Sequence, residues 1–192
     1  MLATALLIAG VAGDAAAAER RVSGLELREI ARKEMLWCET YHPETDDCDV
    51  ITLVRLLPDG RLSETSTLLI QEEPRLQVYI GDYNAIQGDR LCSKIETSKT
   101  SFAFMLEGRP IEPTAAAGLQ MLFMAQLAEF DGKTMCQTFF KDDAQPDVVR
   151  EEITVDGERR EDLESTYILR EGDSGLNLRP QVTDEEDARV QI

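Results

Sequence analysis

The sequence has few of the side chains that most metal and catalytic sites use. Histidine occurs once, at His42, and no two of the four cysteines form a Cys-x-x-Cys pair, so the ligand spacing of a zinc site is missing. Phosphate-binding loops, dinucleotide fingerprints and His-Glu-x-x-His motifs are also absent. We therefore expect no metal and no cofactor, and the sequence assigns no catalytic residue.

Basic residues are scarce as well. The 192 residues include 20 Lys and Arg against 37 Asp and Glu, which gives a formal net charge of −17. Nucleic acids and anionic membrane surfaces attract clusters of Lys and Arg, and this acidic chain has no such cluster. We therefore expect no nucleic-acid partner.

The N-terminus has the order of a secretory signal peptide. Residues 2–13 are almost all apolar, and Asp14 and the four alanines 15–18 follow them. An apolar segment of this length before an Ala-x-Ala site is typical of a cleaved leader, although no basic residue precedes Arg20. A retained anchor is the alternative, but a spanning helix needs about 20 apolar residues. We predict cleavage after Ala18, with no stable membrane insertion of the mature chain.

Cysteine usage agrees with export to the periplasm or the medium. The four residues Cys38, Cys48, Cys92 and Cys136 all follow the predicted cleavage site. An even number of cysteines in an oxidising compartment favours two disulfides, for which three connectivities are open. We favour Cys38 with Cys48 and Cys92 with Cys136, because the first pair closes a short polar loop.

The mature chain contains no internal repeat and no Pro/Gly/Ser-rich linker. This pattern predicts one globular domain over residues 19–172. Residues 173–192 follow as an acidic tail, in which 184–187 are all Asp or Glu. Such chain ends are usually solvated and flexible.

Most of the domain is expected to be strands. Ser23 predicts the N-cap of a short helix over 24–35, and residues 39–49 read as a polar loop. Pro58-Asp59-Gly60 then predicts the turn of a hairpin. The hairpin strands are 50–57 and 61–70, the further strand-like segments are 75–80, 90–95, 101–106, 134–140, 148–155 and 163–169, and 81–88 is a loop.

One longer helix is predicted over residues 115–130, opened by Pro113-Thr114 and closed by Asp131-Gly132. Its apolar residues extend most of the way round, which favours a buried central helix. The alternative is a Met-rich contact surface for a partner or lipid. The fold class is thus α+β. We expect an antiparallel sheet of six to eight short strands that can curve into a barrel, with one buried central helix and a short N-terminal helix.

The tetrapeptide Gly172-Asp173-Ser174-Gly175 resembles the segment around the nucleophile of chymotrypsin-like serine proteases, and its Asp-Ser-Gly part resembles the catalytic loop of aspartic proteases. Either resemblance would imply catalysis by Ser174 or Asp173. However, Leu176 stands where the serine proteases have a further Gly, and His42 lies in Tyr-His-Pro. We interpret the tetrapeptide as a turn, because a motif needs its structural context.

Function follows from the sequence only by elimination. We expect a noncatalytic extracytoplasmic module that binds a small apolar ligand inside the sheet or another envelope protein at its edge. The alternative is a secreted hydrolase using acidic residues, which would need a cleft with carboxyl groups of perturbed pKa. Trp37 is expected to be a core anchor beside Cys38 rather than the floor of a ligand pocket, and His42 to be exposed.

Overall fold

A computed structural model describes residues 19–172 and 175–181 of the chain. The predicted signal peptide, Asp173 and Ser174 of the protease-like tetrapeptide, and the acidic residues 182–192 lie outside the described residues.

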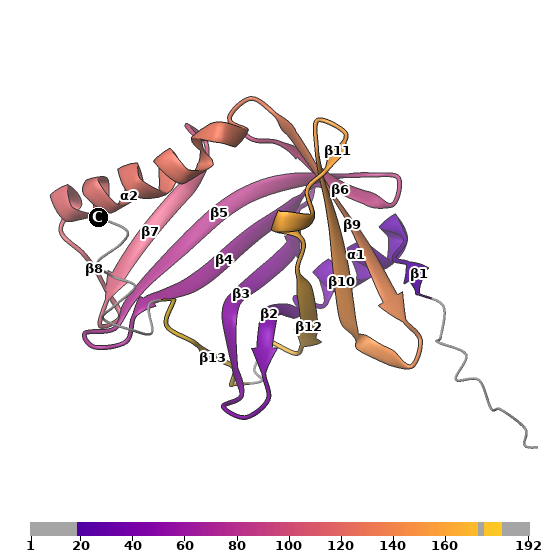
Figure 1. Ribbon diagram of the computed structural model, residues 1–192, viewed down its shortest axis with the longest axis horizontal. Coiled ribbons are helices and arrows are strands. Elements are labelled where there is room, and N and C mark those ends of the chain that lie inside the picture. Colours follow the sequence, from indigo (N-terminus) through magenta and orange to yellow (C-terminus); the bar gives the residue numbers. More distant parts are fainter. Residues whose placement is uncertain (1–18, 173–174, 182–192) are drawn as a thin grey trace, which may run out of the picture.

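Eight antiparallel strands close into a barrel (Figure 1). This confirms the antiparallel, barrel-like sheet, although β3, β4, β5 and β10, of 10 to 12 residues, are longer than the short strands we expected. In order round the barrel, the strands are β2 (Leu36–His42), β3 (Asp47–Leu56), β4 (Leu62–Gln71), β5 (Leu76–Gln87), β6 (Arg90–Lys94), β9 (Thr134–Asp142), β10 (Gln145–Val155) and β12 (Thr166–Arg170), which pairs back with β2.

Between β6 and β9 the chain leaves the barrel. This excursion forms β7 (Ser101–Leu106), β8 (Arg109–Pro110), α2 (Pro113–Leu127) and the short helix η1 (Ala128–Phe130). The long strand β5 serves both parts, because residues 76–81 pair with β7 and residues 85–87 pair with β6. Residues 82–84 pair with β4 alone. The barrel ladder is therefore interrupted at this point of its wall.

The remaining elements are short. β1 (Arg20–Arg21) pairs with β9, β11 (Glu158–Arg159) folds back on β10, and η2 (Glu161–Leu163) precedes β12. β13 (Asn177–Leu178) pairs in parallel with β3, and Pro180 forms a bridge with Leu69. Residues 177–181 of the predicted tail thus lie against the barrel.

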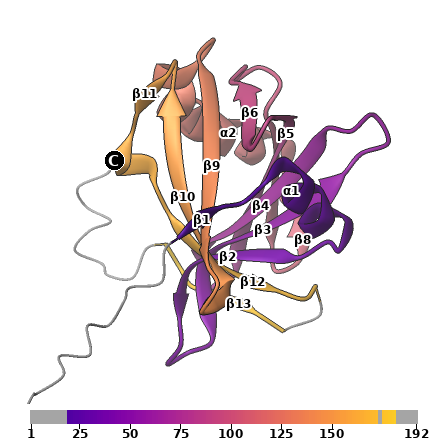
Figure 2. The same ribbon diagram turned by 90° about the vertical axis from the view of Figure 1, so that its right-hand side faces the viewer.

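The N-terminal helix α1 (Gly24–Arg32) is capped as predicted, since the Ser23 hydroxyl accepts a hydrogen bond from the Glu26 amide at 3.2 Å. Figures 1 and 2 place it at the opposite end of the molecule from α2. It packs its apolar face onto side chains from the barrel strands. The resulting core consists of Val22, which precedes the helix, Leu27, Ile30 and Ala31 of the helix, and Trp37, Val54, Leu62, Leu91, Phe139, Val149 and Leu169 of the strands.

The prediction of a buried central helix is wrong. No residue of α2 is buried, and Met121 and Leu122 are 71% and 63% exposed. On its inner side, Phe123 packs against Phe102 and Phe104 of β7, each at a ring-centroid distance of 5.9 Å. The helix has a neighbour on this one side because it lies on one face of the sheet, where β7 extends beyond the barrel. It also lacks the predicted cap at Thr114, since its N-cap is Glu112 and makes no side-chain capping bond.

The two favoured disulfides are present. Cys38 joins Cys48, and Cys92 joins Cys136 directly across the β6–β9 pair that closes the barrel. Such bonds persist in oxidising compartments and therefore indicate an extracytoplasmic location. Within residues 19–172 and 175–181, no helix is long and apolar enough to cross a membrane.

Candidate ligand-binding cavity

The barrel interior is built in layers. Successive side chains of a strand point to opposite faces, so every second residue of each barrel strand faces inward. The apolar core beneath α1 borders a cavity of about 100 Å³. Leu27 of α1, Trp37 and Phe139 lie on its apolar side, and Glu39, Glu64 and Tyr167 are among its polar residues.

A second pocket, of about 320 Å³, adjoins this inner cavity, since Glu64 and Gln137 line both. Its lining is mainly apolar and includes Leu127 of α2. The other apolar residues are Ile80, Ile95, Phe130, Met135, Ile153 and Leu163. We refer to this space as the apolar pocket.

A third pocket, of about 390 Å³, shares Asp82, Asn84 and Ser93 with the apolar pocket. Asp82 and Asn84 belong to the stretch of β5 that pairs with neither β6 nor β7. The interruption in the barrel ladder thus lies beside both pockets.

Hydrogen bonds hold most of the polar groups in this region. The Tyr167 hydroxyl donates to Glu151 Oε2 at 2.8 Å, and the Ser165 hydroxyl donates to Glu39 Oε1 at 2.6 Å. Three buried side-chain atoms have no partner among the described residues, and two of them, Glu151 Oε1 and the Trp37 indole nitrogen, belong to this region. Buried polar atoms are nearly always paired, so these two are available to form hydrogen bonds with a group bound in the cavity.

Burial changes the acidity of the carboxyl groups. It raises the pKa of Glu151, whose residue is 1% exposed, to about 8, with Glu39 and Glu64 adding repulsion and the Tyr167 hydrogen bond opposing it. Burial and the charge of Asp82 raise the pKa of Glu64 to about 7, and burial also raises the pKa of Asp82. Glu64 and Asp82 are directly opposed in the β4–β5 pair. At neutral pH the Glu151 carboxyl is therefore mostly protonated.

The lining carries no compensating charge. Among the residues that the structure describes, neither the inner cavity nor the apolar pocket contains Lys, Arg or His. Within the same residues, no group of three His, Cys, Asp or Glu side chains is placed to hold a metal ion. The interior is thus acidic and partly aromatic, and its charge is compatible with a neutral or cationic group.

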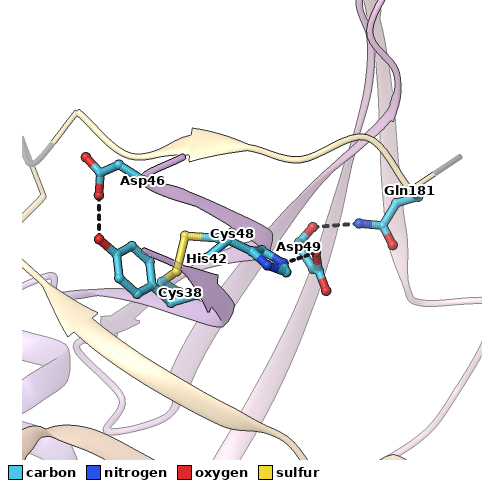
Figure 3. Close-up of a disulfide and its surroundings, with 7 residues drawn as sticks. Cys38, His42, Asp46, Cys48, Asp49 and Gln181 are labelled. Atoms are coloured by element: carbon cyan, nitrogen blue, oxygen red, sulfur yellow. Dashed lines mark hydrogen bonds and ion pairs between the residues drawn. A yellow bond between two sulfur atoms is a disulfide. The ribbon is translucent and has the colours of Figure 1, made fainter. Parts of the chain in front are cut away.

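His42 lies outside this cavity and is half-buried rather than exposed. Arg179 donates a hydrogen bond to its Nδ1 at 3.0 Å, so Nε2 carries the proton and donates to Asp49 Oδ1 at 3.0 Å. The Gln181 amide donates to the Asp49 carbonyl oxygen nearby (Figure 3). These bonds fasten residues 179–181 to the β2–β3 hairpin beside the Cys38–Cys48 disulfide, which gives His42 a structural role.

The sequence did not reveal the cavity residues. Glu39 falls in the predicted loop 39–49, and Asp82 in the predicted loop 81–88, but both belong to barrel strands. Trp37 is buried in the core as expected and also lines the cavity. The available signal was the pair Glu64 and Ser66, polar residues at alternate positions of a confident strand, which indicate a polar inner face.

No protein-family model matches the chain, and no curated protein or solved structure shows a significant similarity to it. The features that bear on function are therefore the barrel and its cavity. Those features define the class: a closed antiparallel eight-stranded barrel with an acidic interior.

Proposed function

We propose that the protein is a noncatalytic extracytoplasmic module that holds a small ligand with an apolar part inside the barrel. An eight-stranded barrel is wide enough either to be filled by its own side chains or to enclose one small ligand. The observation that supports the second outcome is the inner cavity of about 100 Å³ and the adjoining apolar pocket of about 320 Å³. Ligand sites combine such apolar walls with a few polar groups.

Trp37 provides the test. It is the only tryptophan of the chain, is 5% exposed and lines the inner cavity, so its fluorescence reports what enters. We expect short aliphatic compounds to change its emission saturably. Ser66→Leu should abolish the response by filling the inner cavity, whereas Thr65→Leu, at an exposed position of the same strand, should leave it intact. A parent protein that responds to no compound would contradict the proposal.

A secreted hydrolase is the second candidate, because Glu64 and Glu151 have the raised pKa values that acid catalysts need. The size of the inner cavity argues against it. A cavity of about 150 Å³ is known to accept benzene, and this cavity, at about 100 Å³, is smaller. It can admit a head group but not a scissile bond with the groups on both sides of it.

Binding of another envelope protein is the remaining alternative. The exposed apolar side chains Met121 and Leu122 on α2 are what such a module would present. Nothing among the described residues shows what covers them. The hollow barrel therefore makes the small ligand the better-supported proposal.

We further propose that a signal peptide directs the chain to the periplasm or the medium and is removed after Ala18. The two disulfides support an oxidising destination. The intact mass of the exported protein should equal that of residues 19–192 with two disulfides, and should rise by four hydrogens on reduction. Recovery of a species that retains residues 1–18 would contradict cleavage.

A further inference from the structure

The chemistry of the inner cavity restricts which ligand it can hold. Carboxyl groups of Glu39 on β2 and Glu64 on β4 line the inner cavity, that of Glu151 on β10 is close enough to be repelled by both, and Asp82 on β5 lies beside Glu64. None of the four is in an ion pair within the described part of the chain, and the buried cation Lys141 lies 3.7 Å from Glu26 of α1. An anionic ligand would meet repulsion here without compensation.

Aromatic rings form another part of the same cavity. Trp37 packs edge-on against Phe139 at 5.0 Å and against Tyr167 at 5.6 Å, with interplanar angles of 63° and 77°. All three residues line the cavity, and because the rings meet edge-on they are not stacked on one another. Cations are attracted to aromatic ring faces, and cages of such rings bind ammonium groups.

One carboxyl oxygen of Glu151 also lacks a hydrogen-bond partner among the described residues. Glu151 is 1% exposed and its Oε2 accepts from Tyr167, but its Oε1 has no partner among the described residues. Once the carboxyl has lost its proton, the group that completes this oxygen is a hydrogen-bond donor. An ammonium N–H supplies such a donor together with a positive charge.

Building on the proposed function, we infer that the ligand is an organic ammonium ion, with its charged head group in the inner cavity between the Trp37 and Tyr167 rings and the carboxyl groups of Glu39, Glu64 and Glu151. Its alkyl part extends into the apolar pocket, past Leu127 of α2. The sizes agree, because an ammonium head group has fewer heavy atoms than benzene and the larger pocket of about 320 Å³ is the apolar one.

Binding of this ligand is coupled to proton release. Burial holds the pKa of Glu151 at about 8 and that of Glu64 at about 7, so a cation that enters at neutral pH displaces a proton from the cluster. An alkylammonium ion itself keeps its charge to about pH 10. Affinity therefore rises with pH from 6 to 8.5, by roughly 10- to 100-fold. The titratable groups that face Glu151 in this cluster are Glu39, Glu64 and Tyr167, with Asp82 facing Glu64.

The experiment compares n-hexylammonium, n-hexanol and hexanoate, which differ in head group and share nearly the same alkyl part, using Trp37 fluorescence and calorimetry at pH 8. We expect hexylammonium to bind at least about 10-fold more tightly than hexanol, because hydrogen bonds to a charged group are strong, and hexanoate not to bind. Calorimetry in two buffers of different ionisation enthalpy should show proton release for hexylammonium alone.

Variants test the residues named. Glu151→Gln and Glu64→Gln should each weaken hexylammonium binding about 10-fold and flatten its pH dependence, with hexanol binding unchanged. Glu72→Gln removes the same charge at an exposed turn and should leave binding unchanged. Equal or tighter binding of hexanol or hexanoate would overturn the ammonium assignment while leaving a ligand-binding barrel. A failure of all three compounds to bind would remove the proposed function as well.

Discussion

At pH 9 the Glu151→Gln variant should be more stable than the parent protein by about 3 kcal/mol. Burial raises the pKa of this carboxyl from 4.5 to about 8, so between these values the folded protein holds a proton that the unfolded chain releases. The free energy of unfolding therefore falls as pH rises through this window, and the loss is complete above pH 8. Each unit of pKa difference corresponds to about 1.4 kcal/mol, and the amide avoids most of this cost.

Thermal denaturation at pH 5.5 and pH 9 measures the effect. The parent protein should lose melting temperature over this range, and Glu151→Gln should melt roughly 10 °C above it at pH 9, as expected for a chain of this length. Net charge also lowers stability at high pH, so Glu72→Gln is the matched control for the loss of one exposed carboxylate. Melting temperatures of parent and Glu151→Gln that fall in parallel would show that Glu151 is not buried as a neutral acid.

The same buried acids explain where sequence prediction of the fold succeeded and failed. The hairpin around Pro58-Asp59-Gly60 was found because its turn residues have specific backbone preferences and its strands alternate recognisably. Residues 39–42 of β2 and the second half of β5 were predicted as loops. These segments place Glu39, Asp82 and Asn84 on the inner face. Rules of alternation assume an apolar interior, and they fail for a polar one.

The candidate site was hidden for the same physical reason. Glu39, Glu64 and Glu151 are three of 37 acidic residues, and nothing in their spacing along the chain separates them from solvated ones. Their distinguishing property is that barrel closure brings β2, β4 and β10 together, so that Glu39 and Glu64 line one cavity and Glu151 lies close enough to be repelled by both. The pairing β12 to β2 and β6 to β9 creates that property, and both pairings join segments far apart in the sequence.

Helix α2 shows a different limit. Its sequence is apolar on nearly every side, which indicates burial only if neighbours are available on every side. The fold supplies one neighbour, the face of the sheet at β7, and leaves Met121 and Leu122 uncovered. The composition of a helix shows how much apolar surface it could bury. How many of its sides are covered depends on the tertiary structure, which the local sequence does not reveal.

Two adjacent substitutions in α2 make this one-sided packing measurable. Phe123→Asp should lower the free energy of unfolding by about 3 kcal/mol, because it removes the ring that packs on Phe102 and Phe104 and puts a carboxylate in its place. Leu122→Asp introduces the same residue at a position that is 63% exposed, and should change stability by no more than about 0.5 kcal/mol. Urea denaturation followed by circular dichroism gives both values. Similar losses in the two variants would mean that the outer face of α2 is covered in the folded protein, and the helix would then be the contact surface for a partner.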